Sequence, residues 1–148
     1  MITLCDESTK QNVRAFLDRP KNLLSEIRRV QSRIEGLRLS MYPSGIRYDT
    51  DRVMSSPSDP MPRYAAEVDE LQDSLKALMR EYSKAQDDIC SAVLKAGMTN
   101  MEQDVIMLRH VAFYSWTRIA AEESRSIRWM TKVHKMAVRK LEKYFISS

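Results

Sequence analysis

The sequence predicts an all-α protein: a long antiparallel helical hairpin, coiled-coil-like, followed by a C-terminal three-helix helix-turn-helix module. Three observations support this prediction. The 148 residues include only three glycines while 30% are charged, and this composition favours helices over a turn-rich β fold. Apolar residues recur at steps of three and four over long stretches, which is the period of a helix packed on one side. No stretch shows the apolar–polar alternation of a half-buried strand.

Residues 1–19 are weakly patterned and form a separate N-terminal segment, in which Val13, Phe16 and Leu17 indicate a short helix at most. Pro20 suits the first turn of a new helix, because its missing N–H is one that a helix start leaves unpaired in any case. From there an apolar seam with charged residues outside it predicts a coiled-coil-like helix. Its members are Ile27, Val30, Ile34, Leu37 and Met41.

A Pro- and Ser-rich loop over residues 42–62 separates this helix from a second, more regular one. Four prolines within this stretch forbid a continuous helix. The second helix keeps the spacing of three and four from Met61 to Ala96, and it is longer than the first, so part of its stripe needs another partner. Residues 20–97 are therefore expected to be a hairpin that serves oligomerisation, most simply as a dimer, or docking of a partner. The candidate oligomerisation residues are Val68, Leu71, Leu75, Leu78 and Tyr82.

A third domain is expected over residues 98–148. Gly97 can end the preceding helix in the left-handed conformation, and Thr99 with Glu102 predicts a capping box at the start of the next. That helix is expected to bury Met101, Val105, Ile106 and Leu108.

Two helices with a short turn between them then complete a helix-turn-helix pattern. Ser115 is expected to cap a short helix that buries the Ile119–Ala120 pair, and Ser126 to cap the long helix that follows. On the long helix an inward apolar face is expected, consisting of Met130, Val133, Ala137 and Leu141.

The outward residues of this long helix are the candidates for reading DNA. Arg128 could form a bidentate contact with a guanine edge, and Thr131 could contact a thymine methyl group. Lys132 and Lys135 could reach guanine or phosphate. Arg125, before the cap of the long helix, and Ser115 and Thr117, at the start of the short helix, are positioned to contact backbone phosphates. Trp129 has two interpretations, a core or interface aromatic or a ring that contacts DNA or a partner. The complete candidate set is Ser115, Thr117, Arg125, Ser126, Arg128, Trp129, Thr131, Lys132 and Lys135.

The charge distribution supports this assignment. The chain carries a net charge of +4. Residues 109–148 hold nine Lys/Arg against three Glu, a net of +6, whereas residues 1–108 hold 15 Lys/Arg against 17 Asp/Glu, a net of −2. The whole basic excess therefore lies on the segment that phosphate contact requires to be basic.

At these residues the sequence resembles a known family. The Ile119–Ala120 pair, the capping Ser126 and the Ala137–Leu141 segment resemble the helix-turn-helix of sigma factor region four. Other segments of the chain resemble the small phage and prophage late-gene transcriptional regulators of the RinA and ArpU type. The resemblance covers roughly residues 20–145, and it implies a DNA-binding activator of phage late genes. The sequence departs from the pattern at Glu123, Ser124 and His110, where a buried Leu, a Gly and a Tyr are usual. The matching elements are Ile119–Ala120, Ser126, Ala137–Leu141, Leu108–His110, Ser115–Trp116 and Ser56–Met61.

Other classes of function find no support in the sequence. Neither a Gly-rich phosphate loop nor a nucleophile motif is present, so we expect no enzymatic activity and no cofactor. Cys5 and Cys90 are too few for a disulfide framework or a zinc site, and His110 and His134 lack partners at ligand spacing. With no apolar run long enough to span a bilayer and no signal peptide, the chain is expected to be cytoplasmic in a bacterial host cell.

The sequence leaves two other functions open. A DNA-packaging adaptor of the small-terminase kind also joins a helix-turn-helix to helical oligomerisation elements, although that class places its DNA-binding domain first. A protein that binds RNA polymerase or a sigma factor by mimicking region four would have no DNA affinity of its own. The expected partners are double-stranded DNA, host RNA polymerase and a second copy of the chain.

Overall fold

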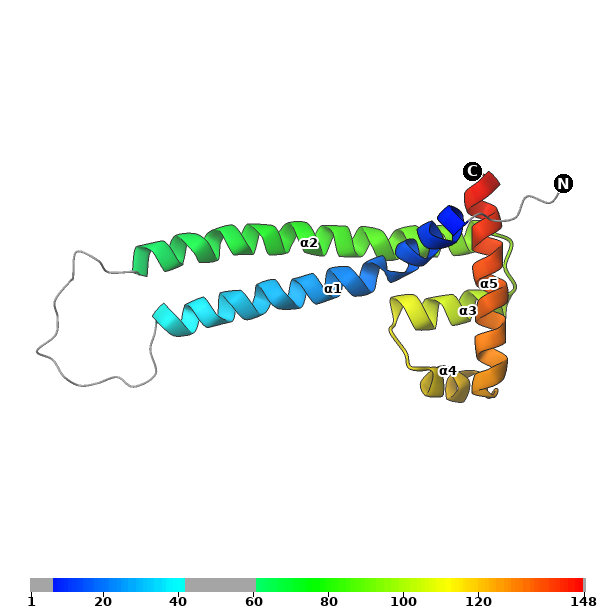
Figure 1. Ribbon diagram of the computed structural model, residues 1–148. Coiled ribbons are helices and arrows are strands. Elements are labelled where there is room, and N and C mark those ends of the chain that lie inside the picture. Colours follow the sequence, from blue (N-terminus) through cyan, green and yellow to red (C-terminus); the bar gives the residue numbers. More distant parts are fainter. Residues whose placement is uncertain (1–6, 42–60, 148) are drawn as a thin grey trace, which may run out of the picture. The chain divides into compact units, whose positions relative to one another are not determined.

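The computed structural model describes residues 7–41 and 61–147, and these residues are helical over most of their length (Figure 1). The elements in chain order are α1 (Glu7–Met41), α2 (Met61–Lys95), α3 (Asn100–Ile106), the π-helical segment η2 (Met107–Val111), α4 (Trp116–Glu123) and α5 (Ile127–Ser147). The described residues contain no strand, and the all-α prediction is confirmed. The predicted loop lies outside the described residues except for Met61 and Pro62, which belong to the first turn of α2.

The first helix begins earlier than predicted. α1 starts at Glu7 and continues through Pro20, so the expectation of a new helix at Pro20 is wrong. The proline costs the helix one backbone hydrogen bond, that to the carbonyl of Phe16. Packing offsets this cost, because Val13 and Leu17 before the proline are buried and the proline itself is fully buried.

The described chain divides into two compact units, and both long helices contribute to each. One unit contains residues 24–41 and 61–80, and the other contains residues 7–23 and 81–147. The predicted division fell between residues 97 and 98. The observed one differs because the first turns of α1 and the last turns of α2 share a core with the C-terminal helices.

In the first of these units α1 and α2 pack against each other as an antiparallel hairpin. Ile34 and Leu37 of α1 form a buried cluster with Val68 of α2. On the surface of this unit the guanidinium of Arg33 binds the carboxylate of Glu67 at 2.9 Å. The predicted hairpin is thus observed, and its apolar seams meet within one chain. Partly buried residues extend the cluster: Val30, Met41, Tyr64, Leu71 and Leu75.

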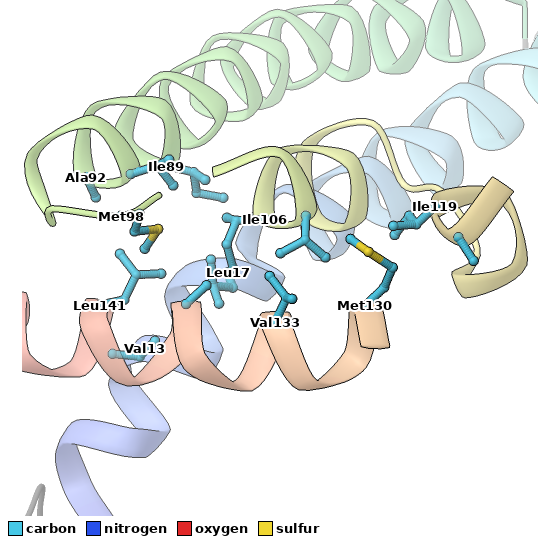
Figure 2. Close-up of a cluster of buried hydrophobic side chains, with 14 residues drawn as sticks. Val13, Leu17, Ile89, Ala92, Met98, Ile106, Ile119, Met130, Val133 and Leu141 are labelled. Carbon is cyan, nitrogen blue, oxygen red and sulfur yellow. The ribbon is translucent and has the colours of Figure 1, made fainter. Parts of the chain in front are cut away.

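The other unit has a larger core, to which all five helices contribute (Figure 2). Val13 and Leu17 of α1 and Ile89 and Ala92 of α2 point toward the same interior as Leu141 of α5. From α3, α4 and α5 come further fully buried side chains: Val105, Ile106, Ile119, Met130 and Ala137.

The start of α3 shows the predicted capping box. The Thr99 hydroxyl accepts from the Glu102 backbone N–H at 3.2 Å, and Glu102 Oε1 accepts from the Thr99 N–H at 2.8 Å. Gly97 precedes it with a φ of 71°, as expected for a helix end. Glu102 has a second role, since the same Oε1 accepts from the ammonium of Lys140 on α5 at 2.6 Å.

Candidate nucleic-acid interface

The turn between α4 and α5 consists of residues 124–126 and is held by hydrogen bonds at both ends. The Ser124 N–H donates to the Ala121 carbonyl at 3.3 Å, and the Arg125 N–H donates to the Ala120 carbonyl at 3.0 Å. These two bonds form a Schellman motif that closes α4. On the other side the Ser126 hydroxyl accepts from the Trp129 N–H at 3.0 Å and caps α5, as predicted.

The two departures from the family pattern in this turn have different consequences. Ser124 adopts the left-handed conformation with a φ of 54°, so it takes the backbone conformation that glycine would supply. Glu123 is half-buried where the pattern has a buried apolar residue. Burial and the neighbouring carboxyl of Asp104 on α3 both raise the pKa of Glu123.

The inward face of α5 is the one predicted. Met130, Val133, Ala137 and Leu141 are at most 5% exposed. The Lys140–Glu102 ion pair adds a polar anchor between α5 and α3, and it lowers the pKa of Glu102 against the effect of burial, which raises it. α5 is therefore fixed along one face, and the opposite face is left for other contacts.

Three predicted cations occupy that opposite face. Arg128, Lys132 and Lys135 are exposed, and Arg125 is exposed in the turn before them. The described part of the chain contains two ion pairs, Arg33–Glu67 and Lys140–Glu102, so none of these four cations is neutralised by a described carboxylate.

The predicted hydroxyl contacts are in part engaged within the protein. Ser115 and Ser126 are exposed, but their oxygens cap α4 and α5. Each hydroxyl proton can still be donated to a phosphate. Thr117 is exposed in the first turn of α4, whereas Thr131 is half-buried and donates its hydroxyl proton to the Arg128 carbonyl at 2.9 Å.

Trp129 combines features of both interpretations. It is 43% exposed, yet its indole N–H points to the Met101 sulfur on α3 at 3.4 Å. The ammonium of Lys132 lies 5.9 Å from its ring centroid. The ring thus rests on α3 and still presents a face beside the exposed cations.

A contact between two histidines, one of them on α5, was not predicted. His110 of η2 and His134 of α5 approach to 2.8 Å between their Nε2 atoms, and the Trp116 ring lies edge-on to His134 at 5.2 Å. Burial lowers the pKa of each to about 4, with neighbouring positive charge as a further cause. The two residues are 24 positions apart, and each has an unremarkable local context, so sequence patterns contained no signal for their pairing.

The candidate oligomerisation residues lie mainly within the chain's own packing. Val68 is buried, and Leu71 and Leu75 pack against the hairpin cluster. Leu78 and Tyr82 are half-buried, and the Tyr82 hydroxyl accepts from the Gln86 side chain at 3.2 Å.

Across residues 7–41 and 61–147 no group of three or more His, Cys, Asp or Glu side chains could hold a metal ion. None of the described helices is long and apolar enough to cross a membrane. Comparison of the chain with protein-family models, curated proteins and solved structures finds no match.

Proposed function

We propose that this protein is a sequence-specific DNA-binding transcriptional regulator in which α5 is the recognition helix. One observation carries the proposal. The capped three-residue turn joins α4 to an α5 whose inner face is buried. Its first turns expose Arg128, Lys132 and Lys135 with no described carboxylate beside them. A recognition helix needs this division between an anchored face and a face that donates hydrogen bonds.

The proposal includes a biological role, an activator of phage late genes. This part rests on the resemblance of the motif residues to the late-gene regulators. Mapping the bound sites on phage and host genomes would test it. A site ahead of a packaging or lysis gene block supports the regulator, whereas sites at the start of DNA packaging would favour a terminase-like adaptor.

Two substitutions test the role of α5 directly. If Arg128 reads a base edge, Arg128→Ala should cost about 1–3 kcal/mol on the cognate site and relax the preference at one base pair. Lys135→Ala should weaken cognate and random DNA alike and lower the salt dependence by roughly one unit, because a phosphate contact carries no sequence information.

The matched control is Lys84→Ala, which removes an exposed cation from α2 in the same compact unit. Gel shifts at two salt concentrations compare the three variants. Unaltered shifts for both α5 variants, together with loss of transcription, would reject the recognition helix in favour of a helix that binds RNA polymerase.

A further inference from the structure

The cationic surface of α5 extends beyond the residues that a recognition helix uses. Arg139 and Lys143 follow Lys135 at steps of four, and both are exposed. At 3.6 residues per turn, the five cations lie within about 80° of arc on one side of the helix. We call them the α5 stripe: Arg128, Lys132, Lys135, Arg139 and Lys143.

The α5 stripe contains no acidic residue. The single acid of α5, Glu142, is buried, with 8% of its surface exposed. The exposed face of α2, in contrast, places opposite charges three residues apart, as at Asp73–Lys76 and Glu81–Lys84. Opposite charges at i, i+3 or i, i+4 stabilise a solvated helix, whereas like charges at i, i+4 repel. The α5 stripe bears this repulsion along its whole length, which an anionic ligand would relieve.

The length of the stripe decides which anion fits it. Along the helix axis Lys135 is about 10 Å from Arg128, a distance that the ~12 Å major groove accommodates. Arg139 and Lys143 are about 16 and 22 Å from Arg128. When the first turns of α5 enter the groove, these two side chains lie past its edge, where the sugar-phosphate backbone runs.

We propose that Arg139 and Lys143 bind backbone phosphates of the duplex that flanks the bases read by the first turns of α5. This inference rests on the proposed function, because it takes the entry of Arg128 and Lys135 into the groove as given. The ligand is the phosphodiester backbone, and the contact is independent of sequence. Duplex phosphate is favoured over an acidic protein because the two cations continue the DNA-reading side of the helix without a break.

The test compares full-length variants on a random 30-base-pair duplex by fluorescence anisotropy over a range of salt concentrations. Arg139→Gln/Lys143→Gln should weaken binding about tenfold and lower the slope of log affinity against log salt by about 2, since each phosphate contact contributes about 0.9. Each single variant should lower the slope by about 1. The charge-conserving Arg139→Lys/Lys143→Arg variant should retain the wild-type slope.

The control Lys84→Gln/Lys95→Gln removes two exposed cations of α2 from the same compact unit and should leave the slope unchanged. If the Arg139/Lys143 variants match this control while Arg128→Gln/Lys135→Gln weakens binding, the extended contact is rejected and the proposed function stands. If the wild-type protein binds no duplex at all, the proposed function fails and this inference with it.

Discussion

Ser124 has a φ of 54° in the turn before α5, a conformation that costs an L-residue about 1–2 kcal/mol and glycine almost nothing. Its N–H and that of Arg125 still close α4, so the turn keeps the required shape with a less suitable residue. This observation separates backbone geometry from residue identity, since the motif's conformation is present although its usual glycine is not.

Ser124→Gly should therefore raise the free energy of unfolding by about 0.5–1 kcal/mol, the relief of strain exceeding the extra entropy that glycine gives the unfolded chain. Urea unfolding measures the change. Ser115→Gly is the matched control, because Ser115 caps α4 with an ordinary φ of −67° and its replacement should cost a few tenths of a kcal/mol. A Ser124→Gly protein less stable than wild type would refute strain at this position.

The His110–His134 pair predicts how stability depends on pH. Burial lowers both pKa values from 6.5 to about 4, so between these pH values the unfolded chain binds more protons than the folded one. Stability should hence be constant above about pH 7 and fall as the pH decreases from 6.5 toward 4. The lowered pKa of Glu102 acts below 4.5.

Unfolding by urea at pH 5 and pH 7.5 tests this prediction. The double variant His110→Gln/His134→Gln should show a smaller difference in stability between the two pH values than wild type. An equal difference in both proteins would assign the acid sensitivity to groups other than the two histidines. Glu123 is not such a group, because its raised pKa favours the folded state as the pH falls.

At the scale of elements, the position of α5 depends on one carboxylate oxygen that serves two helices. Glu102 Oε1 accepts from both the Thr99 N–H and the Lys140 ammonium, while Oε2 is buried with no hydrogen-bond partner. Glu102 is 2% exposed and the Lys140 side chain 35%, so the two partners differ in their access to water if the pair is broken.

This asymmetry predicts that Lys140→Met destabilises the protein more than Glu102→Gln. Lys140→Met leaves a buried carboxylate without its cation and should cost about 3 kcal/mol. Glu102→Gln keeps an oxygen for the Thr99 N–H, and the freed ammonium can turn to water, so the cost should be about 1–2 kcal/mol. Denaturation curves at pH 7 compare them; the reverse order would show that the cap, and not the ion pair, dominates.

Self-association through α2 stays a proposal. Fewer residues of the apolar stripe are free to form a dimer than the sequence indicated, because Val68, Leu71 and Leu75 pack within the chain. Leu71 packs against the hairpin cluster, so Leu71→Asp should lower helicity. Leu78 is half-buried outside that cluster, so Leu78→Asp should shift sedimentation toward the monomer with helicity retained. Wild-type protein that sediments as a monomer at high concentration would exclude the dimer.

Periodicity was sufficient to predict the elements that bury one face over many turns. The inner face of α5 and the hairpin seam were predicted because their apolar residues recur at steps of three and four over several turns, and the capping box at Thr99 because it is encoded within four neighbouring residues. α1 was predicted too short, since Pro20 is a local signal that burial of Val13 and Leu17 overrides. The contact between His110 and His134 depends on how distant segments pack, which no local pattern records.

At the scale of the whole molecule, the C-terminal helices obtain part of their core from the two long helices. Val13 and Leu17 of α1 and Ile89 of α2 are buried with Ile106 and Leu141. The helix-turn-helix is thus one part of a larger compact unit, which residues 24–80 interrupt in sequence. Sequence patterns assigned the long helices to a separate domain because a helix that serves two cores has one continuous stripe.

This organisation predicts which fragments fold. Residues 98–148 alone lack the side chains of Val13, Leu17 and Ile89. Their helices should therefore melt at a lower temperature and with less cooperativity than in the full chain, because burying an apolar side chain of this kind is worth about 1.5–3 kcal/mol.

A chain in which a short Gly/Ser linker replaces residues 24–80 keeps this core complete and should melt cooperatively. It should also keep the salt dependence of DNA binding, because every cation of the α5 stripe is retained. If residues 24–80 couple two copies, the shortened chain should lose affinity for paired sites while its affinity for a single site is unchanged. Circular dichroism melts and anisotropy titrations of both fragments make the comparison. Should residues 98–148 alone melt like the full chain, the contribution of α1 and α2 to this core would be refuted, and a self-sufficient C-terminal module would take its place.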